Sequence, residues 1–282
     1  MNKEERSNNQ EIVNENLKLI VSSNNYQLAH EDKELLNSDE MRGVRMLLEI
    51  SKAEKILDEQ TILSTIIVFG GANLSEKATI NNELKIAKNS LRDKPSSTYL
   101  TRKIERLKNL QSISHYYDSA REFANIVSKQ NQKNNCNSHV IVTGGGPGIM
   151  EAANRGAFDA DCKSIGLNIS LPNEQHPNSY ITPGLCFKFN YFALRKFHFV
   201  MRSVAAVFFP GGFGTFDELF ELLTLRQTGM KKKIPIILFG REYWSRVIDF
   251  QFLSDYGLIS DEHLSLFQYA DSPSEAWELI RQ

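Results

Sequence analysis

Residues 204–218 join an apolar run, a glycine cluster and the start of a helix, and this restricts the fold more than any other stretch. The run 204–209 is unbroken and rich in β-branched and aromatic residues, which predicts a central parallel strand. Pro210 ends that strand because it lacks an amide donor. We expect Thr215 to cap the helix that follows. Between Pro210 and Thr215, three glycines allow a tight turn and close approach of a ligand: Gly211, Gly212 and Gly214.

Such a turn is suited to binding an anion, because free amide groups gather at the positive end of the helix. With Thr215 as the cap, Asp217 and Glu218 fall in the first helical turn, where carboxylates interact well with the helix dipole. A loop that only binds phosphate gains nothing from an acid beside it. We therefore expect Glu218 to act on a group attached to the phosphate, with a plain helix-dipole role as the alternative.

The order of strand, glycine turn and helix occurs again at 139–151, and a strand followed by a glycine turn occurs at 64–73. Strands that alternate with helices predict an α/β fold with a doubly wound, Rossmann-like parallel sheet. Ligands of such sheets bind beyond the carboxyl ends of the strands, where the strand order reverses. The glycine turns 144–148 and 211–214 could face each other there across one cleft. Alternatively, 144–148 is a plain tight turn.

Residues 1–60 form a predicted helical N-terminal extension to a nucleotide-binding domain at 61–282. Helical spacing of apolar residues predicts an amphipathic helix over 39–59, capped by Asp39. We expect this extension to pack across the core or a subunit interface. The polar stretch 74–110 reads as an insertion with its own helical pieces, outside the core. Gly156 is expected to let its helix pack closely on the sheet.

The formal net charge of −1 gives no support for a nucleic-acid or membrane-surface binder. The three cysteines are an odd number without C-x-x-C spacing, so we expect neither a disulfide framework nor a thiolate zinc site. The N-terminus lacks an apolar signal core, and no apolar run approaches the ~18 residues that span a bilayer. A soluble, cytoplasmic protein is the expectation.

Two common nucleotide signatures are missing. A P-loop requires a lysine after its last glycine, and neither the 144–148 turn nor the 211–214 turn has one. A dinucleotide fingerprint requires a third glycine, where this chain has Ile149 and Asp217. The remaining reading is a phosphate site of the mononucleotide type.

The stretch Pro210–Glu218 matches the P-G-G-x-G-T-x-x-E motif of the LOG ("lonely guy") family, and the Arg195-Lys196 pair stands fifteen residues before Pro210, where that family places it. The turn 144–150 resembles the family's other glycine motif. This resemblance covers about residues 64–250 and is closest to the longer bacterial members. It implies hydrolysis of the N-glycosidic bond of a nucleoside 5′-monophosphate such as AMP or a cytokinin ribotide, without a metal or cofactor.

The resemblance also implies roles for individual residues. Glu218 would stabilise an oxocarbenium-like transition state and orient or deprotonate water. Arg195 would grip phosphate or ribose hydroxyls. Dimers or larger homo-oligomers are expected. The residues expected to bind the substrate or its phosphate are Gly144, Gly145, Gly146, Gly148, Glu174, Lys196, Gly211, Gly212, Phe213, Gly214, Thr215 and Thr224.

The chain departs from the family pattern at Asp217, where many members have glutamate, and at 70–73, where others carry Gly-Ser-x-Arg. Cytokinin specificity therefore does not carry over. We expect His198 to be structural and His176 to be exposed, and the lysines 231–233 to form a solvated turn. Two alternatives to the nucleosidase are a nucleotide carrier or sensor without turnover, and a lysine decarboxylase. We discount the decarboxylase because nothing pairs Lys196 with pyridoxal phosphate.

Overall fold

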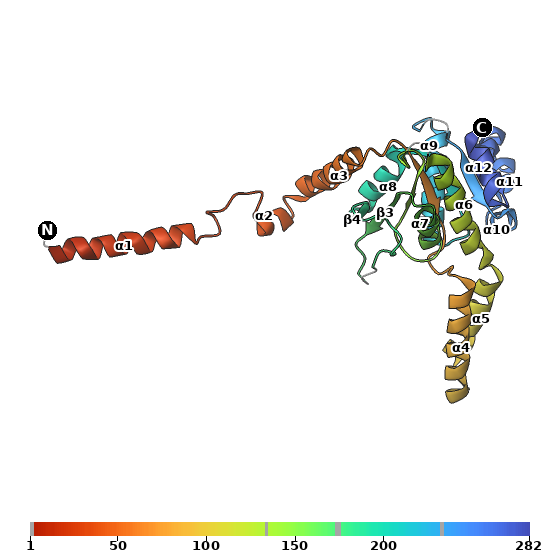
Figure 1. Ribbon diagram of the computed structural model, residues 1–282, viewed down its shortest axis with the longest axis horizontal. Helices are drawn as coiled ribbons and strands as arrows, with labels where there is room; N and C mark the ends of the chain where they lie inside the picture. Colours follow the sequence, from red (N-terminus) through yellow and green to blue (C-terminus); the bar gives the residue numbers. More distant parts are fainter. Residues whose placement is uncertain (1–2, 133–134, 173–175, 232–233) are drawn as a thin grey trace. The chain divides into compact units, whose positions relative to one another are not determined.

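The computed structural model describes residues 3–132, 135–172, 176–231 and 234–282 (Figure 1). The chain divides into two compact units, one ending at Lys52 and the other running from Ala53 to Gln282. The division falls earlier than the expected boundary after residue 60. Helix α3 (Arg42–Glu59) spans it, and Ala53 and Leu57 on its second half are buried.

Within the described residues, the second unit is built on a seven-stranded parallel sheet of order β4-β3-β2-β1-β5-β6-β7. β1 therefore has β2 on one side and β5 on the other, with Ile66 paired to both Ile141 and Ala205. The strand order reverses between β1 and β5, which confirms the doubly wound fold. The strands are β1 (Thr65–Phe69), β2 (Val140–Thr143), β3 (Ser164–Ile169), β4 (Cys186–Phe189), β5 (Ser203–Phe208), β6 (Ile236–Phe239) and β7 (Gln268–Ala270).

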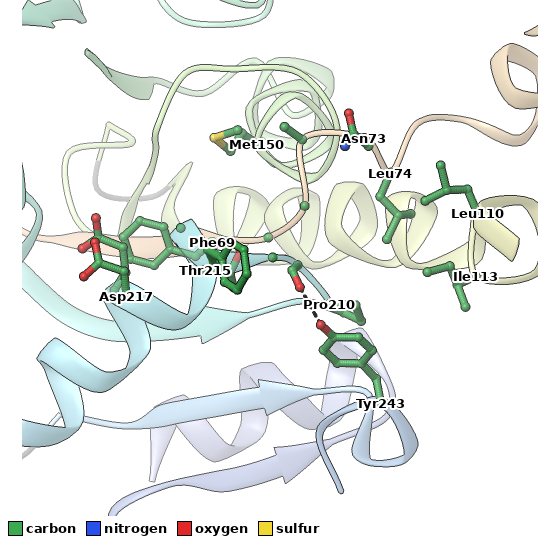
Figure 2. A pocket seen from close by; sticks show the side chains of 18 of the residues that line it. Phe69, Asn73, Leu74, Leu110, Ile113, Met150, Pro210, Thr215, Asp217 and Tyr243 are labelled. Atoms are coloured by element: carbon green, nitrogen blue, oxygen red, sulfur yellow. Dashed lines mark hydrogen bonds between the residues drawn. The ribbon is translucent and has the colours of Figure 1, made fainter. Parts of the chain in front are cut away.

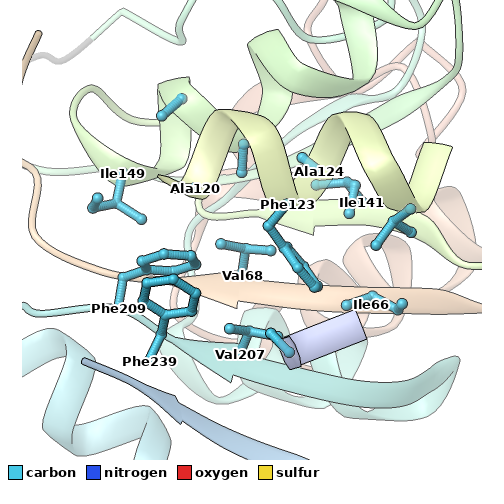
Figure 3. Close-up of a cluster of buried hydrophobic side chains, with 14 of the residues drawn as sticks. Ile66, Val68, Ala120, Phe123, Ala124, Ile141, Ile149, Val207, Phe209 and Phe239 are labelled. Atoms are coloured by element: carbon cyan, nitrogen blue, oxygen red, sulfur yellow. The ribbon is translucent and has the colours of Figure 1, made fainter. Parts of the chain in front are cut away.

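Both faces of the sheet are covered by helices. One face packs on α6 (His115–Asn131), α7 (Ile149–Asp159) and α12 (Pro273–Arg281), with Phe123 fully buried between α6 and the strands (Figure 3). On the other face, Phe69 of β1 packs against Phe199 of α8 (Phe192–Met201), with ring centroids 4.8 Å apart and ring planes tilted by 59°. Every residue of β1 is buried, as expected of a central strand.

Helices α6 and α7 approach each other closely at Gly156, and this corrects the expectation that Gly156 packs on the sheet. A Cβ atom at Gly156 would lie 2.0 Å from the carbonyl oxygen of Arg121 on α6. The Asn125 side chain, also on α6, donates a hydrogen bond of 3.1 Å to the Gly156 carbonyl. The glycine is required for helix-on-helix contact.

The insertion forms a hairpin of two helices, α4 (Lys77–Asp93) and α5 (Thr98–Ser112), as expected. Ser97 caps α5 by accepting a bond from the Leu100 amide. At its base, Glu76 pairs with Arg155 of α7 at 2.7 Å. The hairpin has a small core of its own, made by Ile80, Leu84, Ala87, Ile104 and Leu107.

The first unit contains α1 (Lys3–Val21), α2 (Lys33–Asn37) and the start of α3. The side chains of α1 from residue 9 onward are exposed. Asp32 caps α2 through the Leu35 amide. The expectation that Asp39 is the N-cap of α3 is wrong, because that helix begins three residues later, at Arg42. In the part of the chain that the structure describes, no helix combines the length and the apolar character needed to cross a bilayer.

One further expectation is wrong. Cys136 and Cys162 form a disulfide, although their spacing matches no cysteine motif. Strand β4 lies at the edge of the sheet, just before α8. Its alternating pattern, with Phe187 and Phe189 buried, is that of a half-buried edge strand. The remaining elements are α9 (Phe213–Gln227), α10 (Arg241–Val247), α11 (Phe250–Asp255) and the 3₁₀ helix Asp261–Leu266.

Candidate functional site

A cavity of about 490 Å³ lies where the strand order reverses, beyond the carboxyl ends of β1 and β5. The turn 69–74 after β1 and the turn 210–215 after β5 form its walls. These turns are joined by a 2.9 Å hydrogen bond from the Gly71 amide to the Pro210 carbonyl. The position is the one that doubly wound sheets use for ligands.

The cavity has two ends of different character. In Figure 2, Asp217 and Thr215 lie at one end, and Leu74, Leu110 and Ile113 lie at the other. Leu110 belongs to α5 and Ile113 caps it, so the insertion contributes to the cavity wall as well as to its own core. The Tyr243 hydroxyl donates a 2.5 Å hydrogen bond to the Gly211 carbonyl, which holds the β5 turn from below.

Helix α9 begins two residues before Thr215. Its cap is Gly212, whose backbone is extended (φ −108°, ψ −154°), and Phe213 is the first helical residue. Thr215 lies inside the first turn, where its amide bonds to the Gly212 carbonyl. The expectation that Thr215 is the N-cap is therefore wrong. Its side chain instead fills the space beside Gly211, where a Cβ atom would lie 2.0 Å from the threonine Oγ1.

The first amides of α9 are free to bind an anion. Among the described residues, the amides of Gly212, Phe213 and Gly214 donate to no protein acceptor. These three residues are exposed and line the cavity. Free amides at the positive end of a helix favour a phosphate group.

Glu218 lies in the second turn of α9, beyond the range of the helix dipole. This removes the alternative in which Glu218 is only a dipole partner. Its side chain lines the cavity and is 10% exposed. Burial raises the pKa of Glu218 to about 7, and the nearby Lys196 and Arg195 oppose that rise. The carboxyl can therefore exchange a proton near neutral pH.

Arg195 reaches the same cavity from α8. Its Nε donates a 2.7 Å hydrogen bond to the Leu167 carbonyl of β3, and its guanidinium stacks 5.3 Å from the centre of the Phe199 ring. Burial lowers the pKa of Arg195, and the charge of Glu218 opposes that change. An arginine in such a site keeps its charge. Gly144 gives this guanidinium room, since a Cβ there would lie 2.5 Å from Nη2.

The turn 144–148 does not line the cavity, so the two predicted glycine turns do not face each other across it. Its glycines Gly144, Gly145, Gly146 and Gly148 are buried. Gly148 has φ +73°, and a Cβ there would lie 2.4 Å from the Gly71 carbonyl oxygen. Since β1 is the neighbour of β5, the turn that faces 210–215 is the turn after β1, and 144–148 supports that turn and Arg195 from behind.

The other predicted residues lie around this centre. Lys196 forms ion pairs with Asp217 and Glu221 at 2.8 and 2.9 Å. Phe213 is 95% exposed on the cavity rim. Thr224 is exposed outside the cavity, and its hydroxyl donates to the Phe220 carbonyl of its own helix. Glu174 lies outside the described residues.

The histidine and lysine expectations have mixed outcomes. His198 is buried with Nδ1 3.1 Å from Glu54 Oε1, which confirms a structural role, and His176 is exposed. Lys231 is not simply solvated, because its ammonium donates to the Val200 carbonyl. Lys232 and Lys233 lie outside the described residues.

Sequence reasoning missed Tyr243, Leu110 and Ile113. Tyr243 follows β6, the next strand along the sheet, so its position at the same edge could have been inferred from the strand order. Leu110 and Ile113 carry no such signal, because the direction of the inserted hairpin depends on its packing.

Residues 150–280 match the model of a family described as "Possible lysine decarboxylase". No curated protein matches the chain. The X-ray structure of TM1055, a structural genomics target, is 17% identical, with a TM-score of 0.47, over 78% of this chain and 99% of that one. Two structures of the molybdenum cofactor carrier protein from Chlamydomonas reinhardtii are 17% and 18% identical, with TM-scores of 0.41 and 0.40, over 78% of this chain and 96% of theirs. The matched family segment includes Arg195, Glu218 and the β5 turn.

Proposed function

We propose that this chain hydrolyses nucleoside 5′-monophosphates. Its residues 150–280 match the model of the family described as "Possible lysine decarboxylase", a label that LOG proteins also carry. Water would replace the base at C1′ of the ribose, giving free base and ribose 5-phosphate. One observation carries the proposal. Glu218 and Arg195, from two different helices, line the same cavity as the free amides of the β5 turn.

Each group has a chemical use in this reaction. The amides of 212–214 suit the 5′-phosphate at the end of α9. As the bond from C1′ to the base nitrogen breaks, positive charge develops on the ribose, and the Glu218 carboxylate can stabilise it. The same carboxylate can accept a proton from the attacking water, because its pKa of about 7 suits a base at neutral pH. Arg195 can bind ribose hydroxyls or phosphate oxygens.

The contacts of Lys196 argue against a Schiff-base decarboxylase. Such an enzyme needs a lysine that gives up its proton to become a nucleophile. Partial burial opposes the charge of Lys196, but hydrogen bonds to Asp217 and Glu221 outweigh it and raise the Lys196 pKa. The amine is therefore kept protonated and held by carboxylates.

We also propose that the protein works as a homodimer or a larger homo-oligomer. Large aromatic side chains are exposed on the two helices that carry the site: Phe192 and Phe197 on α8, and Phe213 and Phe220 on α9. Exposed apolar clusters of this kind favour protein–protein contact.

The test is release of free adenine from AMP, followed by chromatography. We expect Glu218→Gln and Arg195→Ala each to lower turnover by about 100-fold or more, because each removes a group that stabilises the transition state. Glu218→Gln should still bind AMP in calorimetry. Glu242→Gln, an exposed acid on α10, is the matched control and should keep wild-type turnover.

Full activity of Glu218→Gln or Arg195→Ala would remove that residue from the mechanism. A wild-type protein that binds AMP tightly but releases no base would instead support the alternative of a carrier or sensor. A panel of nucleoside monophosphates in the same assay would then give the base preference.

A further inference from the structure

The ammonium group of Lys196 is shared unequally among three carboxylates of α9. Its Nζ lies 2.8 Å from Asp217 Oδ2 and 2.9 Å from Glu221 Oε2, but 3.9 Å from Glu218 Oε2. Asp217 and Glu221 are four residues apart, so they lie on one face of the helix and can hold the same cation. Glu218, which lines the cavity and is the most buried of the three acids, is thus the one farthest from the lysine.

The charges around Glu218 come from two elements. Helix α8 provides the cations Arg195 and Lys196, and α9 provides the anions Asp217 and Glu221. Across the cavity, the Tyr243 hydroxyl is engaged with the Gly211 carbonyl. Among the residues that the structure describes, no cation lies at hydrogen-bond distance from Glu218, although Lys196 is long enough to reach a carboxylate beside it.

We propose that Asp217 and Glu221 are positioning residues, which hold the Lys196 ammonium away from Glu218 and leave the Glu218 carboxyl facing the cavity without a hydrogen-bonded cation. The use of Glu218 in catalysis rests on the proposed function, but the arrangement itself does not. Asp217 also lines the cavity, but its carboxylate, like that of Glu221, is engaged with Lys196.

The consequence for Glu218 follows from simple electrostatics. A lysine at hydrogen-bond distance would favour the ionised carboxylate and lower its pKa. With Lys196 held by its two flanking acids, burial is the largest influence on the Glu218 pKa, and the negative charges of Glu221 and Asp217 raise it further. Asp217 and Glu221 therefore act in two ways, through their own charge and by withholding the lysine.

The test is a pH titration of the Glu218 carboxyl carbon by NMR on the full chain. Its signal is identified by its absence from Glu218→Gln. We expect a midpoint near pH 7 in the wild type. Asp217→Asn and Glu221→Gln should each lower that midpoint by about one pH unit, because removing an anion and freeing the lysine both favour the carboxylate. Lys196→Met should raise it, and Glu242→Gln should leave it unchanged.

Asp217 is 61% exposed, so Asp217→Asn should fold normally and keeps the test decisive. An unchanged or raised midpoint in Asp217→Asn and Glu221→Gln would overturn the inference. The acidic limb of adenine release should shift to lower pH with the Glu218 midpoint in both variants, whereas a merely structural role would lower activity at every pH. If the midpoints shift as expected but the wild type releases no adenine, the positioning role stands and the proposed hydrolysis fails.

Discussion

Glu218 is an acid that the folded protein holds in an unfavourable place. Its pKa rises from an ordinary value of 4.5 to about 7 on folding, which corresponds to a cost of about 3 kcal/mol when the carboxyl is ionised. The folded protein therefore favours the protonated carboxyl over the ionised one. The contribution of Glu218 to the free energy of unfolding is highest at low pH, and it falls as pH rises from about 4.5 through 7.

We therefore predict that Glu218→Gln makes the protein more stable than the wild type at pH 8, by up to about 3 kcal/mol, and that the difference shrinks toward pH 4.5. Glutamine keeps the shape of the protonated acid without its charge. Urea unfolding at several pH values measures the effect. The exposed Glu242→Gln is the control, and equal stability of Glu218→Gln and wild type at pH 8 would show that burial does not strain the carboxylate.

The helix pair α6–α7 shows how one residue sets the distance between two elements. Gly156 is in the middle of α7, where glycine lowers helix stability relative to alanine. Glycine at this position allows α6 and α7 to pack closely, because any side chain would clash with the Arg121 backbone of α6. The same helix carries Met150 at the cavity and begins beside the turn that supports Arg195.

We predict that Gly156→Ala lowers the free energy of unfolding by about 1–3 kcal/mol, since a backbone atom rather than a flexible side chain must move. Urea unfolding followed by circular dichroism measures it. Gly214→Ala is the matched control, because a Cβ at Gly214 meets nothing within 4 Å and that residue is also helical. A stabilising effect of Gly156→Ala would contradict the close helix contact.

At the scale of the whole molecule, the disulfide between Cys136 and Cys162 acts on the unfolded chain. It joins residues 26 apart in sequence and so closes a loop in the denatured state. The closed loop lowers the conformational entropy of the unfolded chain, so less entropy is lost on folding and the folded state is stabilised. Cys186 is exposed and not part of the bridge.

We predict that a reductant, or the double change Cys136→Ser with Cys162→Ser, lowers the free energy of unfolding by about 2–4 kcal/mol. Chemical unfolding with and without reductant tests this in one series. Cys186→Ser should retain both the stability and its dependence on reductant. A protein that unfolds identically in both conditions would show that the bridge does not stabilise it.

Local patterns in the sequence determined much of the architecture. The apolar run 204–209 forms the buried strand β5, and the insertion at 74–110 forms the helices α4 and α5, as their sequence patterns predict. These features depend on contacts within a few residues, so a short stretch of sequence contains the information. The motif at 210–218 likewise identified the turn and the acid that line the cavity.

Only the tertiary structure decided which parts meet there. The order of the strands makes the β1 turn, and not the turn 144–148, the partner of the β5 turn. Packing also determined the burial of Glu218, the ion pairs of Lys196 with the acids of α9 and the pairing of Cys136 with Cys162. The physical reason is range: backbone geometry and capping act between near neighbours, whereas burial, charge pairing and strand order depend on segments that are distant in sequence and meet only after folding.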